Sequence, residues 1–198
     1  MNRRNALAFL GLALMSTRSK MALAGAFEDF FKAIRFDDEH RLKNLLLKGM
    51  DANSTDEKGF PAITVAMLQD SPRAVAVLLR SPGLNPNQLD PRGESPLMVA
   101  SALDRPEWVS ALVAKGAKQG GNGQWTALHN AAASGSSRSV EILLKAGGRV
   151  DVLSPNDTTP LMMAARQGRE QTARLLLKMG ANPALKNQSG LDAAAYAL

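Results

Sequence analysis

The chain contains no cysteine and only two histidines among its 198 residues. The absence of cysteine excludes disulfide bonds, thiolate metal sites and cysteine nucleophiles, and it also excludes a lipoprotein signal. Two histidines without cysteine cannot supply the ligands of an ordinary zinc site. The sequence therefore predicts no metal site.

Motifs of covalent and phosphate chemistry are also missing. No serine stands in a G-x-S-x-G turn. The glycine-rich stretch at residues 120–123 lacks the Gly-Lys-Ser/Thr ending of a phosphate-binding loop and follows no strand pattern. We therefore predict no catalytic residue, no cofactor and no enzyme activity; an enzyme with a pocket assembled between structural units is the alternative, and it would need a cluster of titratable groups in a cleft.

Long apolar segments are scarce, and the one that exists lies near the start. Residues 6–15 form an apolar run that is too short to span a bilayer. Cationic residues precede this run, and small residues follow that fit cleavage after Ala24 or Ala26. The pattern predicts a signal peptide over residues 1–26 and export of residues 27–198 to the periplasm.

The export route and the fate of the leader stay open in the sequence. The pair Arg3-Arg4 is compatible with a twin-arginine signal as well as with the general secretory (Sec) route. No second run of about 18 apolar residues exists, so we expect no stable membrane insertion after cleavage. An uncleaved leader that anchors the chain to the inner membrane is the alternative.

Excess positive charge is nearly absent outside the leader. The whole chain has 24 Lys and Arg against 18 Asp and Glu. Four of these cations and none of the acids lie in residues 1–26, so 20 cations face 18 acids in the remainder. Because the cations are interspersed with acids, we expect no nucleic-acid partner, which would require a concentrated basic face.

Repetition is what the chain has in abundance. A block such as Ser95-Pro96-Leu97 returns with starts at residues 28, 61, 95, 126, 159 and 192, about every 33 residues. A paired aliphatic step and a small-residue turn follow the first five starts at a near-constant distance. A repeat of this length predicts a stack of small supersecondary units, since a single unit cannot bury its own apolar face.

Each unit reads as two short helices and an extended turn. In the unit that begins at Thr159, that residue is a helix cap and Pro160 occupies the first turn. Gln167-Gly168 ends the first helix, and a second helix runs from near Arg169 to Gly180. Exposed tips are predicted at five turn-forming pairs of residues, namely 58–59, 92–93, 122–123, 156–157 and 189–190.

These residues resemble the ankyrin repeat family, whose signature combines Thr-Pro-Leu-His, two alanines, a glycine, a Leu-Leu pair and Gly-Ala. The resemblance implies an all-α solenoid of stacked helix-turn-helix pairs with projecting β-hairpin tips. It covers residues 27–198 as about five repeats and a truncated half-repeat that stops inside its first helix. Departures include Asp157, which stands where the tip glycine usually does, and the short spacing before residue 126.

The resemblance also implies a role. We expect a non-catalytic, monomeric module or scaffold that binds another protein in the periplasm and that protects or organises an envelope enzyme. An immunity or inhibitor protein that occludes a toxin or enzyme is the alternative.

The candidate partner-binding residues lie on the tips and at the ends of the first helices. Trp125 and Phe60 are the strongest candidates, because the mature chain has few aromatic residues and exposed aromatic residues are good anchors. The alternative for Trp125 is that its side chain folds over a neighbouring hairpin. The full set comprises Phe60, Arg92, Glu94, Leu103, Trp125, Thr158, Arg166 and Gln167, with Gln69, Ser134 and Leu191 nearby.

Two further residues have structural roles by the same resemblance. His129 occupies the histidine position of the signature, which implies a side chain that hydrogen-bonds local backbone and braces the hairpin. Trp108 begins a second helix, and we expect it to pack on the convex side.

Overall fold

The computed structural model describes residues 25–121 and 123–197. The predicted signal peptide lies outside these residues, apart from residues 25 and 26, which belong to a helix over residues 25–35. None of the helices in the described ranges has the length and apolar character needed to cross a membrane.

Short helices arranged in pairs make up the described chain. After the helix over residues 25–35 come α2 (Glu39–Leu47), α3 (Ala62–Leu68), α4 (Pro72–Arg80), α5 (Pro96–Ala102), α6 (Pro106–Ala114), α7 (Ala127–Ser134), α8 (Ser137–Lys145), α9 (Pro160–Arg166) and α10 (Glu170–Lys178).

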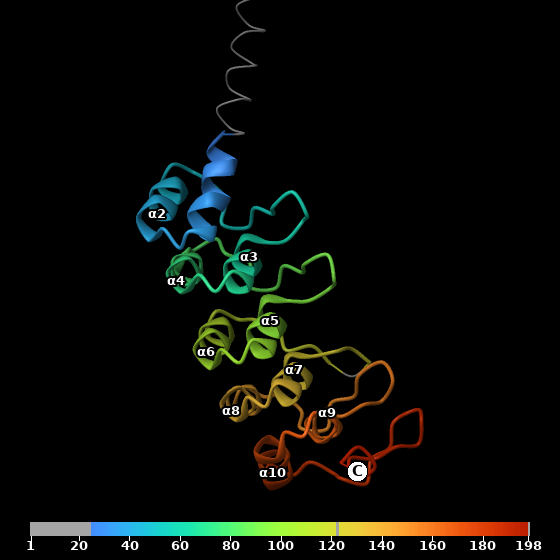
Figure 1. Ribbon diagram of the computed structural model, residues 1–198. Coiled ribbons are helices and arrows are strands. Elements are labelled where there is room, and N and C mark those ends of the chain that lie inside the picture. Colours follow the sequence, from blue (N-terminus) through green and yellow to red (C-terminus); the bar gives the residue numbers. More distant parts are fainter. Residues whose placement is uncertain (1–24, 122, 198) are drawn as a thin grey trace, which may run out of the picture.

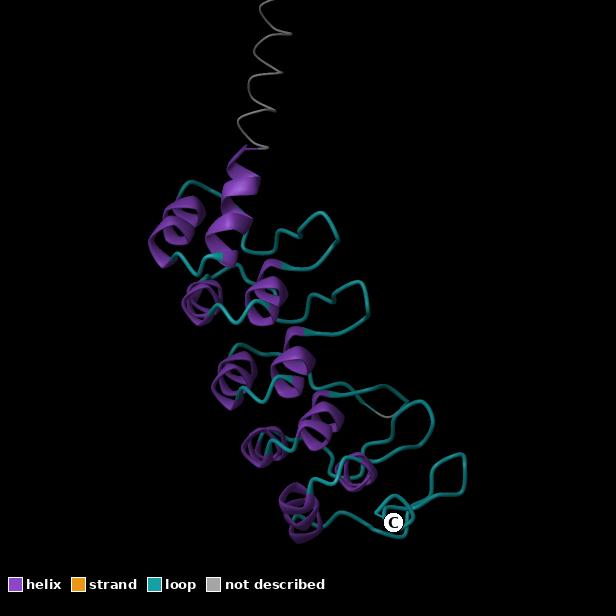
Figure 2. Cartoon of the chain, viewed as in Figure 1, coloured by secondary structure: helices purple, strands orange, loops and turns teal. Residues whose placement is uncertain are grey.

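The helices form two layers, and the tips project from one side of the stack (Figure 1). In the first layer α3, α5, α7 and α9 pack on one another in order. In the second layer α2 packs on α4, and α6, α8 and α10 pack on one another in order. The all-α solenoid predicted from the repeat is confirmed. The tips, however, are turns rather than strands (Figure 2), with an isolated bridge between Thr55 and Pro61 in the described residues.

Local sequence sets the start of the first helices. Thr159 Oγ1 accepts a hydrogen bond from the Met162 N–H at 3.2 Å, and Pro160 is the first helical residue, as predicted. Ser95 caps α5 in the same way through the Met98 N–H. These caps satisfy backbone donors that the first turn of a helix leaves without partners.

The turn within each unit uses a left-handed residue. The positions are Asp37, Asp70, Asp104, Gly135 and Gly168, with φ between 50° and 88°. Glycine takes this conformation without steric cost, and aspartate tolerates it. The change from aspartate to glycine along the stack has consequences for the charge of its surface.

The C-terminal segment differs from its prediction. Residues 193–196 form a turn where the first helix of a half-repeat was expected. The Ala197 N–H donates to the Ala194 carbonyl, and Asn187 Nδ2 donates to the Tyr196 hydroxyl at 2.8 Å.

Candidate functional site

Four tips of the described chain share one turn geometry. In the first of them the Asp56 N–H donates to the Phe60 carbonyl and the Gly59 N–H donates to the Asp56 carbonyl, both at 2.9 Å. Asp56 Oδ1 also accepts from the Phe60 N–H. The residues that anchor the four turns in this way are Asp56, Asp90, Ser154 and Asn187.

The third tip departs from this geometry because Gly121 stands at the anchor position and offers no side-chain acceptor. Its backbone instead reaches the next unit, where the Gly123 N–H donates to the Leu153 carbonyl at 2.8 Å. The short spacing before residue 126 thus coincides with a different set of hydrogen bonds.

A groove of about 990 Å³ lies between the second and third tips and extends over the first helices below them. We call it the tip-side groove, and it brings together three predicted binding residues. Its lining comprises Asn87, Leu89, Arg92, Gly93, Glu94, Ser95, Met98, Lys118, Gln119, Gly120, Gln124, Trp125, Asn130 and Met163.

Trp125 is both packed and exposed. Its ring meets the His129 ring edge-on, with centroids 5.3 Å apart, while 41% of the residue is accessible to solvent. One part of the indole therefore packs against His129 of α7, while another part remains accessible at the groove. An aromatic ring fixed in this way loses little conformational freedom on binding.

Arg92 forms a rigid rim on the opposite side. Its guanidinium is 2.7 Å from both Asp90 Oδ2 and Glu94 Oε2, and it lies over the Phe60 ring at 5.5 Å. The hydrogen bond to Asp90 holds the pKa of Arg92 above its ordinary value. Phe60 thus belongs to the same rim as Arg92 and Glu94, although it does not line the groove.

The floor of the groove is apolar with neutral amides. Met98 and Met163 are partly buried, and Asn130 Nδ2 donates to the Met98 carbonyl at 3.1 Å. Sequence reasoning missed these three residues, although each lies three or four positions after a block start, where a first helix faces the tips. That constant offset was the signal that could have identified them.

His129 is structural, as predicted. The imidazole is fully buried; its Nδ1 lies 2.9 Å from Thr126 Oγ1 and its Nε2 lies 2.9 Å from the Thr158 carbonyl. Since a carbonyl only accepts, Nε2 carries the proton and Nδ1 accepts from Thr126. Burial lowers the pKa of His129, so the neutral ring is favoured.

The other predicted binding residues lie elsewhere. Thr158 is a correction, since it is buried with 5% accessible and offers its carbonyl to His129 rather than to a partner. Leu103 is exposed at the C-terminal end of α5, and Arg166 and Gln167 are exposed at the end of α9. None of these three residues lines the groove. Gln69 and Leu191 are exposed, and the Ser134 hydroxyl is bonded to the Ser101 carbonyl.

The second tryptophan packs as predicted. Trp108 in α6 is buried, with the Arg105 guanidinium over its ring at 5.2 Å.

The groove is suited to noncovalent recognition. Its lining combines the exposed indole of Trp125 and the thioethers of Met98 and Met163 with several side-chain amides. Its two cations are Arg92, which is paired with an acid, and Lys118. Across the described ranges, no three His, Asp or Glu side chains lie close enough together to hold a metal ion.

Comparison with known proteins agrees with the architecture. A family model of ankyrin repeats in three copies matches residues 30–122 and 117–187. A putative ankyrin repeat-containing protein of Treponema pallidum is 29% identical over 177 residues, which cover 86% of this chain and 58% of that protein.

Two other relatives match over shorter stretches. A probable E3 ubiquitin-protein ligase of rice, XBOS31, is 48% identical over 59 residues, or 30% of this chain and 13% of the ligase. The glycerophosphocholine phosphodiesterase gde1 of Schizosaccharomyces pombe is 30% identical over 129 residues, or 62% of this chain and 11% of that enzyme. The chain thus spans from about a tenth to somewhat over half the length of these relatives. With paired helices in register and the family match over most of its length, the chain belongs to the ankyrin repeat family.

Proposed function

We propose that the chain is a non-catalytic module that binds another protein in the periplasm, and that the tip-side groove holds an extended segment of that partner. Ankyrin repeats indicate protein binding. The observation that carries the choice of site is Trp125, which is exposed by 41% at a groove of about 990 Å³.

The chemistry of the lining favours an extended polypeptide segment. Trp125, Met98 and Met163 offer apolar contact to a partner side chain. The side-chain amides of Gln124 and Asn130 can exchange hydrogen bonds with a partner backbone. Aromatic residues at the centre of such a site carry a large part of the binding free energy.

The test is recovery of a partner from periplasmic extract with the protein as bait, quantified by mass spectrometry. We expect Trp125→Ala to reduce recovery of a specific protein by about tenfold or more, since central aromatic anchors contribute about 2 kcal/mol or more. Leu177→Ala is the matched control, because Leu177 is also an exposed apolar residue but lies on α10, away from the groove.

Two results would count against the groove. One is equal recovery by Trp125→Ala and the unchanged protein. The other is a loss for Trp125→Ala that is explained by unfolding, which the melting temperature measures. The identity of the recovered protein would separate an envelope enzyme from a toxin.

The periplasmic location has its own test. It is supported by the cationic start, the apolar run over residues 6–15 and the small residues before position 27. Cell fractionation followed by mass measurement should find a periplasmic form that begins at Gly25 or Phe27. A full-length form that remains with the inner membrane would contradict cleavage and favour the anchored alternative.

A further inference from the structure

Four arginines lie at the starts of the second helices, and the first two differ from the last two in their ion pairs. Arg73 and Arg105 belong to the second and third units, whereas Arg138 and Arg169 belong to the fourth and fifth.

The first two arginines are neutralised by the preceding unit. Arg73 Nε lies 2.9 Å from Asp37 Oδ2, and Arg105 Nη2 lies 2.5 Å from Asp70 Oδ1. Both aspartates occupy the left-handed position of their turns. An acid at that position therefore reaches the arginine of the next unit.

The last two arginines have no such partner within residues 25–121 and 123–197. Glycine replaces aspartate at the left-handed positions 135 and 168. Asp104 retains the acid before the fourth unit, yet no ion pair joins it to Arg138 in the described chain. Arg138 and Arg169 are therefore without an ion-pair partner in the described residues, and for Arg169 the reason is that glycine replaces the acid of the preceding turn.

Contacts between the fourth and fifth units hold Arg169 in place and join α8 to α10. The aliphatic stem of Arg169 lies against Gly135, and its Nε donates to the Ala133 carbonyl at 3.0 Å. A hydrogen bond of 2.9 Å between the Ser137 and Thr172 hydroxyls joins the first turns of α8 and α10. Arg138 therefore lies one turn from the point where Arg169 is fixed.

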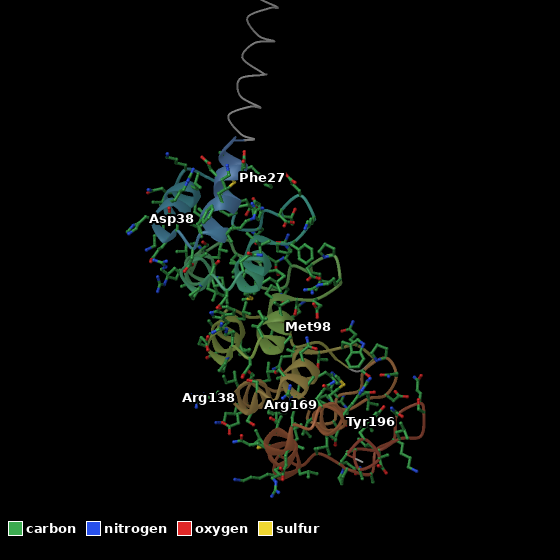
Figure 3. All side chains as sticks on the ribbon, viewed as in Figure 1. Phe27, Asp38, Met98, Arg138, Arg169 and Tyr196 are labelled. Carbon is green, nitrogen blue, oxygen red and sulfur yellow. The ribbon has the colours of Figure 1, made fainter. Side chains whose placement is uncertain are left out.

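A third arginine, Arg166, adds to the same region, three residues before Arg169 at the end of α9. Arg138, Arg166 and Arg169 are all exposed, and the first and last are labelled in the C-terminal half of the stack in Figure 3. We name these three residues the arginine cluster.

We propose that the arginine cluster is a second docking surface, distinct from the tip-side groove, which binds an acidic segment of a partner protein. Guanidinium groups pair with carboxylates through two parallel hydrogen bonds, and Arg169 is already fixed through its Nε, so less conformational freedom is lost on binding. A nucleic acid or an anionic membrane would call for a longer basic track than three arginines.

The experiment measures binding of a fluorescein-labelled peptide of twelve glutamates to the full chain by fluorescence anisotropy at low and moderate ionic strength. We expect salt-sensitive binding that Arg138→Gln with Arg169→Gln weakens by about fivefold, from two exposed ion pairs. Arg73→Gln with Arg105→Gln removes the same net charge from arginines that are already paired, and this control should change the affinity less than about twofold.

Three outcomes would overturn the proposal. They are absence of peptide binding, equal weakening by both double variants, and tighter binding to a twelve-nucleotide single strand or to phosphatidylglycerol vesicles than to the peptide. Trp125→Ala should leave peptide binding unchanged, so failure of the tip-side groove and failure of the arginine cluster give different results.

Discussion

Single side chains decide how each first helix joins its tip. The third residue after the block start is Thr64, Met98, His129 and Met162 in the second, third, fourth and fifth units, respectively. In the fourth unit the imidazole links Thr126 at the start of α7 with the Thr158 carbonyl at the end of the same unit, so it ties the first helix to the tip that follows. Its neutral form is required for this pattern, because a protonated ring could not accept from Thr126.

We expect the stability of the protein to depend on pH through His129. The pKa of the folded state lies below the unfolded value of about 6.5, so the contribution is fully present above that value and is lost as pH falls below it. His129→Met, which copies the third and fifth units, should remove this dependence. Urea unfolding between pH 7.5 and 5 measures it; parallel curves for the two proteins would contradict the assignment.

Thr64 offers a complementary residue-scale test. Its hydroxyl is buried and has no hydrogen-bond partner among the described residues. Thr64→Val should therefore raise the free energy of unfolding by about 1 kcal/mol, because a buried polar group without a partner is destabilising. Thr172→Val is the control and should lower it, since that buried hydroxyl donates to the Gly135 carbonyl at 2.8 Å.

At the scale of elements, the tips depend on their anchors. The Asp90 carboxylate has no solvent exposure and accepts from the N–H groups of Arg92 and Glu94 as well as from the Arg92 guanidinium. The rim of the tip-side groove is therefore built on one residue. The third tip shows an alternative, in which Gly121 offers no side chain to anchor the turn and the Gly123 backbone bonds to the next unit.

Asp90→Ala should lower the free energy of unfolding by about 2–4 kcal/mol, because it leaves backbone donors and a guanidinium without their acceptor. Asp90→Asn retains an oxygen acceptor for the backbone and should cost less. Chemical denaturation of both variants checks this order. Equal losses would mean that the ion pair with Arg92, rather than the turn, dominates.

At the scale of the whole molecule, the main contacts between the described helices α2 to α10 join helices of the same unit or of adjacent units. Stability should then behave as a sum of units and interfaces, so that position along the stack matters. Tryptophan fluorescence reports on the third and fourth units, through Trp108 and Trp125, whereas circular dichroism reports on every helix.

Leu128→Ala and Leu42→Ala test this dependence on position. Both leucines are buried and each truncation removes the same atoms, at a cost of about 2–5 kcal/mol. We expect Leu128→Ala in the fourth unit to lower the urea midpoint seen by tryptophan fluorescence strongly. Leu42→Ala in the first unit should lower mainly the midpoint seen by circular dichroism. Equal shifts of the fluorescence midpoint would indicate one fully cooperative domain.

The sequence by itself determined the repeat, the helix pairs and the caps such as Thr159. These features depend on local propensity and on a spacing that every unit repeats. It also named Arg92, Glu94 and Trp125, because tip positions follow directly from that spacing.

Only the tertiary structure decided which of these residues share a surface. Burial of Thr158 and the floor formed by Met98, Asn130 and Met163 depend on how neighbouring units stack. The same holds for the arginine cluster, since an aspartate at a turn neutralises an arginine about 35 residues away only when the two units are in contact. Such pairings arise from packing between units, which the repeat pattern of a single unit does not contain.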